Sequence, residues 1–147
     1  MRRLLILNGP NLNKLGSREP EIYGTDTLSD IENMCRQKAQ EFNFDIDFRQ
    51  TNNESQLIEW IQDPPRETLG LIINAAAFTH TSLAIHDALK MCGIPTIEVH
   101  LSNPAAREEY RHFSYISPVA SGVISGFGAM SYDLAVCAMH DLLNNSQ

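Results

Sequence analysis

Long apolar runs are missing from this sequence. Arg2 and Arg3 precede only a short apolar stretch that stops at Asn8. A secretory signal needs a core of about 7–15 apolar residues, and a membrane-spanning helix needs about 20. The sequence therefore predicts a protein with no signal peptide and no membrane segment, located in the cytoplasm.

Cysteine is also scarce. The 147 residues include three cysteines, Cys35, Cys92 and Cys137, and none of them are related by CxxC spacing. An odd number without that spacing fits neither a disulfide framework nor a zinc site. Because each cysteine falls in a predicted helix, we expect buried and reduced thiols.

Positive charge is limited, with a net charge of -7 at pH 7. Nucleic acids and anionic membranes attract clustered lysine and arginine, so the composition disfavours both as partners. The scarcity of lysine also bears on chemistry, since catalysis through a Schiff base needs a desolvated lysine. Lys38 and Lys90 fall on predicted helix surfaces and Lys14 in a loop, which makes this route the weaker enzyme hypothesis.

Motifs for metals and phosphates are missing as well. No HxH or HExxH spacing connects the histidines available for a site, His80, His86, His100 and His112. We therefore expect no metal. Residues 122–128, GVISGFG, match neither GxGxxG nor GxxxxGK[ST]. A flavodoxin-like module that binds a nucleotide or flavin stays open as the non-enzyme alternative, although Pro10 and Leu12 stand where a phosphate loop needs glycines and hydroxyls.

Short apolar segments alternate with helical patterns along the whole chain. Strands are predicted at residues 4–7, 44–49, 70–73, 96–99 and 123–124. Strands that alternate with helices form a parallel sheet covered on both faces. The length suits one domain over residues 1–147. We predict an α/β, three-layer flavodoxin-like fold whose five-stranded parallel sheet has the order 2-1-3-4-5.

Capping residues predict where helices begin. Thr27 and Asp30 have the spacing of a capping box before a helix that reaches about residue 42. Ser82 is placed to cap a helix that ends at Gly93. The last helix is predicted from about residue 129 to 143, and five apolar residues are expected on its inner side: Met130, Leu134, Cys137, Ala138 and Leu142.

Polar residues follow several predicted strands directly. Asn11 follows the first strand, residues 74–80 the third and residues 100–111 the fourth. Ligands of open α/β sheets bind at the carboxyl ends of the strands, near the point where the strand order reverses. The segment of about residues 13–25 has no predicted secondary structure, and loops of that length are often lids. We expect these segments to meet in one crevice under that lid.

Tyr23 and Arg18 both lie in the predicted lid. A phenol has an ordinary pKa of about 10, and an opposite charge within about 4–6 Å favours its ionised form. The pair could therefore supply a phenolate base. The alternative is that Tyr23 packs the lid down while Arg18 is a solvated charge.

His100 stands at the end of the fourth strand, and Glu98 lies two residues earlier on the same face. A carboxylate in that position can fix the tautomer of an imidazole. The alternative is a core histidine bonded to backbone. Backbone amides at Leu101 and Ser102, before a short helix that begins at Asn103, suit a substrate carboxylate.

Three more positions are candidates. Arg111 is expected near the end of that short helix, where a salt bridge to Glu108 is its alternative role. His80 lies among hydroxyl residues just beyond a buried strand. His86 and Asp87, inside the following helix, are expected on a solvated face.

Taken together, these residues resemble a known family, type II 3-dehydroquinate dehydratase. The resemblance spans nearly the full chain in the family's order and is carried by four segments: LNGPNLNKLGSREPEIYG at 7–24, INAAAFTHTSLAIHDAL at 73–89, EVHLSNPAAREEYRHFS at 98–114 and GVISGFGAMSYDLA at 122–135. It implies anti elimination of water from 3-dehydroquinate to 3-dehydroshikimate, with no cofactor and no metal. It does not separate a role in the shikimate pathway from one in quinate degradation.

The resemblance also implies catalytic roles. Tyr23 corresponds to the base that removes the proton next to the ketone, and Arg18 to the arginine that promotes its ionisation. The enolate that forms is held through a water bound by Asn11. His100, oriented by Glu98, then protonates the departing hydroxyl.

Substrate recognition is implied for six positions: Asn74, His80, Asp87, Leu101, Ser102 and Arg111. Asp87 is implied to act from a neighbouring subunit, because the family assembles as trimers grouped into homododecamers. Three positions depart from the family's usual residues: Lys14 replaces an aliphatic residue, Ser55 a glycine and Phe78 a tyrosine. None of these three is a chemical group in the scheme.

Overall fold

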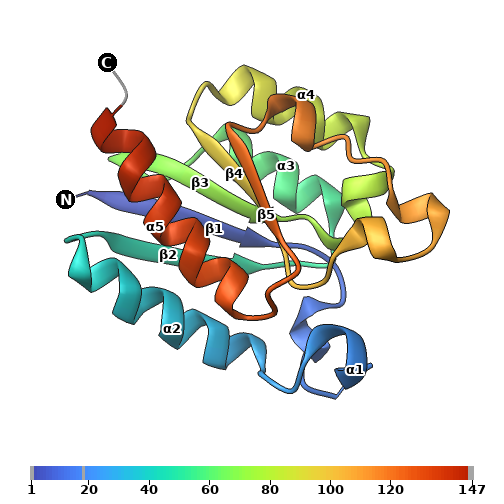
Figure 1. Cartoon of the computed structure of the whole chain (residues 1–147). Helices are drawn as coiled ribbons and strands as arrows, with labels where there is room; N and C mark the ends of the chain where they lie inside the picture. The colour runs from blue at the N-terminus through green and yellow to red at the C-terminus, as the bar shows by residue number, and fades with distance from the viewer. Residues whose placement is uncertain (1, 18, 146–147) are drawn as a thin grey trace.

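Five parallel strands form one sheet in the computed structural model, which describes residues 2–17 and 19–145 (Figure 1). The sheet has the order β2-β1-β3-β4-β5, so the predicted order is confirmed. The strands are β1 (Arg3–Asn8), β2 (Asp45–Gln50), β3 (Thr68–Asn74), β4 (Thr96–His100) and β5 (Gly122–Ser125).

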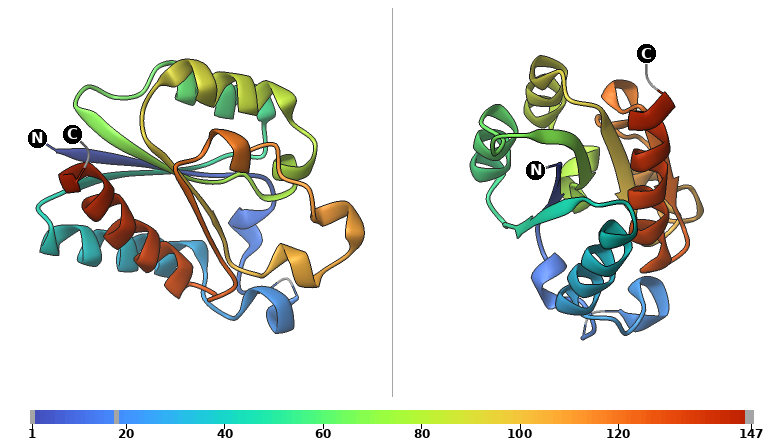
Figure 2. Two further views of the ribbon diagram at one scale, coloured as in Figure 1. Left: turned by 45° about the horizontal axis from the view of Figure 1, so that its top comes forward. Right: turned by 90° about the vertical axis from the view of Figure 1, so that its left-hand side faces the viewer.

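Helices cover both faces of the sheet, which completes the predicted three layers. The α-helices are α1 (Pro20–Tyr23), α2 (Leu28–Glu41), α3 (Glu54–Gln62), α4 (Leu83–Cys92) and α5 (Met130–Asn145). Helices α2 and α5 lie together on one face, and α3 and α4 lie on the other (Figures 1 and 2). None of the helices found in residues 2–17 and 19–145 combines the length and the apolar character that a membrane span needs.

The central strand β1 shows how the sequence builds both layers. Leu4 and Ile6 pack into the core under α2 and α5, while Leu5 and Leu7 pack into the core under α3 and α4. Successive side chains of a strand point to opposite faces, so a strand buried on both faces must be apolar at every position. The apolar run of β1 is therefore the sequence of a mid-sheet strand.

The residues that end β1 and β3 lie side by side. In the parallel register Asn8 is paired with Asn74, and the backbone N–H of Gly9 donates to the carbonyl of Asn74 at 2.8 Å. The strand order reverses between β1 and β3, because the connection from β1 leads to β2 on one side and the connection from β3 leads to β4 on the other. A Cβ on Gly9 would lie 2.4 Å from the carbonyl oxygen of Ala75, so the two backbones approach as closely as only glycine permits.

The predicted lid contains regular structure, contrary to expectation. A 3₁₀ helix, η1 (Leu12–Lys14), follows β1, and the four-residue helix α1 begins at Pro20. Asn11 and Glu19, which precede the two helices, have positive φ angles of 70° and 40°. Helices of three and four residues are too short to show an apolar periodicity, which is why the sequence did not reveal them.

Helix α5 presents a different face to the core from the one predicted. Its buried residues are Ser131, Tyr132, Ala135, Val136 and Met139. Met130 and Leu134 are instead exposed, while Ala138 and Leu142 pack against the edge of the core. Apolar residues populate both sides of this helix, so their spacing alone did not determine which side faces the sheet.

Two smaller expectations also differ from the structure. The short helix predicted at Asn103 is two 3₁₀ helices, η3 (Pro104–Ala106) and η4 (Glu109–Arg111). Cys35 is buried, and burial raises the pKa of its thiol to about 12, whereas Cys92 and Cys137 are only partly buried. The predicted helix caps at Thr27 and Ser82 are confirmed.

The capping box of α2 provides a test of local stability. The Thr27 hydroxyl accepts from the backbone N–H of Asp30 at 3.1 Å, and the Asp30 carboxylate accepts from the N–H of Thr27 at 2.9 Å. Thr27→Ala is expected to lower the free energy of unfolding by about 1 kcal/mol, measured by urea denaturation. Thr25→Ala, an exposed threonine before the helix, is the matched control. An equal loss in both variants would contradict the cap's contribution.

Candidate active site

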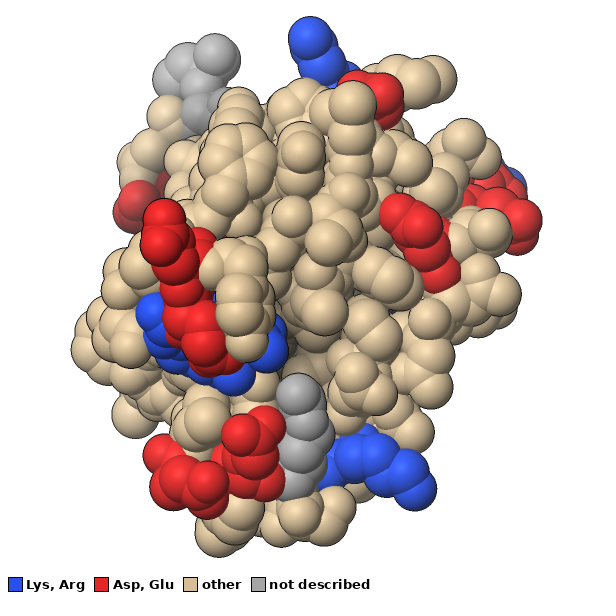
Figure 3. All heavy atoms as spheres, turned by 90° about the vertical axis from the view of Figure 1, so that its right-hand side faces the viewer, with Lys and Arg blue, Asp and Glu red and all other residues tan. Residues whose placement is uncertain are grey.

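A cavity opens at the edge of the sheet where the strands end. Figure 3 looks onto this edge and shows mainly uncharged atoms, with charged side chains toward the margins. The cavity is lined by residues that follow β1, β3 and β4, together with the end of α1: Pro10, Asn11, Leu12, Tyr23, Asn74, Ala76, Ala77, His80, His100, Leu101, Ser102, Pro104, Arg107 and Arg111.

Most of the residues predicted for the site line this one cavity. They are Asn11, Tyr23, Asn74, His80, His100, Leu101, Ser102 and Arg111. Glu98 lies behind His100 instead of at the cavity surface. Asp87 is exposed on α4 and is not among the lining residues. Arg18, predicted to act on Tyr23, lies outside the residues that the structure describes.

Tyr23 is the last residue of α1, and an arginine that sequence reasoning missed lies over its ring. The guanidinium carbon of Arg107 is 5.1 Å from the centroid of the Tyr23 ring. One of its terminal nitrogens donates to the Ser102 hydroxyl at 3.3 Å. Its buried Nε has no hydrogen-bond partner among the described residues. A largely buried cation against the phenol ring supplies positive charge where the predicted base lies.

His100 and Glu98 form a close pair on one face of β4. The distance from His100 Nε2 to Glu98 Oε2 is 2.5 Å, and both side chains are almost fully buried. A carboxylate that accepts the Nε2–H leaves Nδ1 as the ring nitrogen available to a ligand. His100 lines the cavity, so this nitrogen can exchange a proton with a bound molecule.

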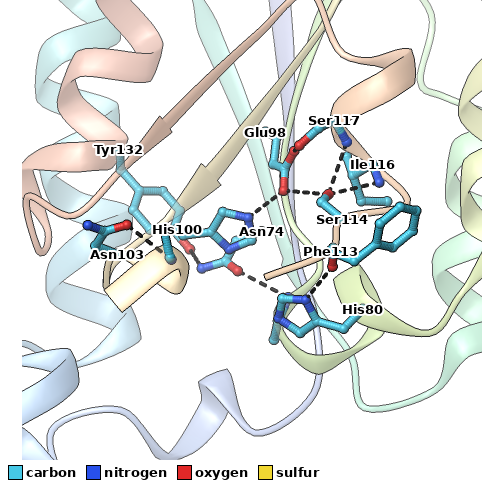
Figure 4. A network of polar contacts seen from close by, with 12 residues as sticks. Asn74, His80, Glu98, His100, Asn103, Phe113, Ser114, Ile116, Ser117 and Tyr132 are labelled. Atoms are coloured by element: carbon cyan, nitrogen blue, oxygen red, sulfur yellow. Dashed lines mark hydrogen bonds and ion pairs between the residues drawn. The ribbon is translucent and has the colours of Figure 1, made fainter. Parts of the chain in front are cut away.

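Two serines also donate hydrogen bonds to the Glu98 carboxylate (Figure 4). Ser114 donates to Oε2 at 2.9 Å and Ser117 donates to Oε1 at 2.5 Å. Burial by itself would raise the pKa of Glu98, but the bonds from His100, Ser117 and Ser114 outweigh burial and keep that pKa below its usual range. Glu98 is therefore a carboxylate at neutral pH, and it lies against the His100 imidazole.

Asn74 is held from beneath by a buried tyrosine of α5. Its Nδ2 donates to the hydroxyl of Tyr132 at 2.9 Å, and its Oδ1 accepts from the backbone N–H of Ala76 at 3.1 Å (Figure 4). The Tyr132 hydroxyl in turn donates to Asn8 Oδ1 at 2.6 Å. Sequence reasoning missed Tyr132, because it lies 58 residues from Asn74 and no local pattern joins them.

His80 and His86 both bind the segment that follows η4. His80 Nδ1 lies 2.8 Å from the carbonyl oxygen of Phe113, and His86 Nδ1 lies 2.6 Å from that of Tyr115. Carbonyl oxygens only accept, so each Nδ1 carries a proton, and Nε2 is the ring nitrogen of His80 that this bond leaves unused. The expectation that His86 lies on a solvated face is therefore wrong.

Arg111 lies at the cavity and also forms the salt bridge to Glu108 that was its alternative role. It lines the cavity, and its Nε donates to Glu108 Oε2 at 3.0 Å. Bonds from Arg111, the Glu108 backbone and Tyr110 lower the pKa of Glu108 to about 2. The carboxylate therefore helps to hold the guanidinium in place beside the cavity.

The three lysines lie away from the cavity lining. Lys14 and Lys90 are exposed, and Lys38 forms an ion pair with Glu41 at 3.2 Å, which raises the pKa of Lys38. Residues 2–17 and 19–145 contain no group of three or more histidine, cysteine or acidic side chains arranged to hold a metal ion. The arrangement places a phenol and a carboxylate-backed imidazole on one cavity, which suits proton removal and delivery.

Comparisons with known proteins agree closely with one another. The profile of the family described as Dehydroquinase class II matches residues 2–140. A 3-dehydroquinate dehydratase of Rhizobium meliloti is 51% identical over 144 residues, which cover 98% of this chain and 97% of that protein. One from Hyphomonas neptunium is 58% identical over 133 residues, covering 90% and 89%.

Two solved structures are similar to this chain over nearly its full length. The type II dehydroquinase from Propionibacterium acnes has a TM-score of 0.90 at 42% identity, covering 96% of this chain and 97% of that one. The type II dehydroquinase from Butyrivibrio crossotus has a TM-score of 0.91 at 41% identity, covering 98% of each chain.

The Glu98 pair predicts a specific dependence of stability on pH. The pKa of Glu98 is below its ordinary value of 4.5 in the folded protein, so the ionised carboxylate stabilises the fold above about pH 4.5. That stabilisation is lost as the pH falls through the lowered pKa. Glu98→Gln is expected to lower the free energy of unfolding, measured in urea, by about 1–3 kcal/mol at pH 6 and by less at pH 3. A cost that does not change between these pH values would contradict this assignment.

Proposed function

This chain belongs to the class II dehydroquinase family, and we propose that it removes water from 3-dehydroquinate with Tyr23 as the base and His100 as the acid. Its activity is that of a 3-dehydroquinate dehydratase, a hydro-lyase of the shikimate pathway. The observation that carries this conclusion is the family match over residues 2–140. The proposed roles of individual residues are supported by a cavity in which the base and the acid face the same space.

Removal of the proton next to the ketone is assigned to the Tyr23 phenolate. A carbon acid beside a ketone is weak, so the base must be strong and still ionised near neutral pH. The cation of Arg107, 5.1 Å from the ring centroid, places positive charge beside the proposed base. Arg18, five positions before Tyr23, is proposed to add a second cation when substrate is bound.

The electron pair of the broken carbon–hydrogen bond moves onto the ketone oxygen and forms an enolate. We assign its stabilisation to Asn11 through a bound water. Asn11 lines the cavity, and its backbone N–H donates to Asn52 Oδ1 at 2.9 Å, which anchors the turn after β1. An oriented amide next to developing negative charge stabilises it without reorganisation.

Collapse of the enolate expels the hydroxyl group, and His100 supplies the proton that lets it leave as water. The proton comes from Nδ1, because Nε2 is bonded to Glu98. The ionised Glu98 accepts from Nε2 and thereby orients the ring. Tyr23 ends with one extra proton and His100 with one fewer, so exchange with solvent restores both groups.

Substrate recognition is assigned to groups around the cavity. The Leu101 backbone and the Ser102 hydroxyl are proposed to bind the carboxylate, while Asn74, His80 and Arg111 bind oxygen groups of the ring. All five residues line the cavity. The three departures from the family's usual residues, Lys14, Ser55 and Phe78, are absent from the lining, so we expect the same reaction.

We also propose that the protein is cytoplasmic and that its copies form trimers grouped into a homododecamer. Asp87, the remaining substrate-binding residue by resemblance, is exposed on α4 and is absent from its own chain's cavity lining. A neighbouring copy is therefore the source from which Asp87 would reach a cavity. Exposed apolar side chains such as Phe127 and Met130 offer surface that assembly would bury.

Assembly is tested by sedimentation and kinetics together. The expected particle is a dodecamer of the 16.5 kDa chain, and Asp87→Ala is expected to lower kcat/KM. Light scattering or analytical ultracentrifugation measures the mass. A fully active monomer, in which Asp87→Ala has no effect, would remove this part of the proposal.

The base is tested by Tyr23→Phe. The variant is expected to fold normally and to lose dehydratase activity by a factor of about 10³ or more, because the phenol oxygen that accepts the proton is gone. The assay follows the ultraviolet absorbance of the conjugated enone after 3-dehydroquinate is added. Tyr115→Phe, which removes a phenol outside the cavity lining, is the matched control and should retain activity. Turnover near the wild-type rate in Tyr23→Phe would remove Tyr23 from its role.

A further inference from the structure

Three uncharged polar side chains meet beneath the floor of the cavity, in the layer between the sheet and α5. Asn8 and Tyr132 are fully buried, and Asn74 is 3% exposed. They come from β1, β3 and α5, and they are joined by hydrogen bonds of 2.6 Å and 2.9 Å. Buried polar groups are costly unless they are paired, so a network here requires an explanation beyond core packing.

The direction of each hydrogen bond follows from its neighbours. Asn8 Nδ2 lies 2.9 Å from the carbonyl oxygen of Arg49, which can only accept. The other end of this amide, Oδ1, therefore faces Tyr132 and accepts its hydroxyl hydrogen. Burial raises the pKa of Tyr132, so the hydroxyl keeps that hydrogen. Tyr132 has only one hydrogen to donate, so its bond to Asn74 must be one that it accepts.

Asn74 is consequently held in one of its two amide orientations. Its Nδ2 must face Tyr132, and its Oδ1 faces the backbone N–H of Ala76 at 3.1 Å. In a flipped amide, Nδ2 would face the backbone N–H of Ala76, so that two donors meet. Oδ1 would face the hydroxyl oxygen of Tyr132, so that two acceptors meet. The second Nδ2 hydrogen, which neither bond uses, thus keeps a fixed position at the cavity that Asn74 lines.

We propose that Tyr132 is a positioning residue for the dehydration, because its hydroxyl, directed by Asn8, fixes the amide donor that Asn74 presents to an oxygen of the substrate. The inference rests on the proposed function, since it needs a substrate at Asn74. Tyr132 does not line the cavity and acts only through Asn74. Asn8 and Asn74 are register partners on adjacent strands, so one hydroxyl reaches both amides.

The first experiment compares Tyr132→Phe with a matched loss of a hydroxyl elsewhere. Phenylalanine keeps the ring in the core but leaves Asn74 Nδ2 with no partner beneath it. KM for 3-dehydroquinate is expected to rise and kcat/KM to fall by about 10-fold to 100-fold. The pH limbs of the rate profile should stay in place, because Tyr23 and His100 are untouched. Thr96→Val removes a buried hydroxyl at the opposite end of β4, and its kcat/KM should change less than 2-fold.

A double-mutant cycle separates positioning from general stability. In an Asn74→Ala background Tyr132→Phe should have little further effect on kcat/KM, because the group that it positions is already gone. A purely structural role would lower kcat/KM by the same factor in both backgrounds. Equal factors, or kinetics of Tyr132→Phe that match those of Thr96→Val, would overturn the inference.

A second variant covers the case in which Tyr132→Phe does not fold. Asn8→Leu keeps Tyr132 but frees its hydroxyl hydrogen, so the hydroxyl can turn that hydrogen toward Asn74 and no longer holds Nδ2 as a fixed acceptor. The same rise in KM is expected, and an unchanged KM would contradict the inference. Turnover of the wild type is the reference throughout. If the wild type does not convert 3-dehydroquinate, the proposed function itself is removed. If the wild type is active and the variant is unaffected, only this inference is removed.

Discussion

A parallel sheet ends all its strands on the same side, and the polar groups at the strand ends depend on that constraint. β1, β3 and β4 are largely buried strands whose last residues, Asn8, Asn74 and His100, are polar. Because the strands run side by side, residues far apart in the sequence become neighbours where the strands stop. The cavity is therefore a consequence of topology, and its chemistry comes from what each strand carries at its end.

The opposite faces of the sheet support the site from two sides. Glu98 and His100 share the face that is covered by α4 and the segment after η4, and Ser114 and Ser117 from that segment satisfy the carboxylate. Asn74 is satisfied from the α5 layer by Tyr132. Burial in a low-dielectric interior strengthens these bonds and makes each missing partner costly. His100 and Asn74 are thus held by side chains that do not line the cavity.

Patterns confined to a few neighbouring residues were predicted well. The capping box of Thr27 and Asp30, the cap at Ser82 and the end of β4 at His100 follow from residue type and short spacing. The pair of Glu98 and His100 was also accessible, because residues two apart on a strand share a face. Arg107 was missed, since nothing in its local sequence distinguishes it from Arg111, and only the packing of α1 brings Tyr23 beneath it.

By itself the sequence determined the five strands, their parallel arrangement and the polar residues at their ends, because alternation and capping are local properties of the chain. Tertiary structure alone decided which side of α5 is buried, since apolar residues lie on both sides and only packing against the sheet selects Tyr132 over Met130. It also decided which distant partners satisfy Glu98 and Asn74, because a hydrogen bond between residues of different layers has no signature in the sequence that separates them.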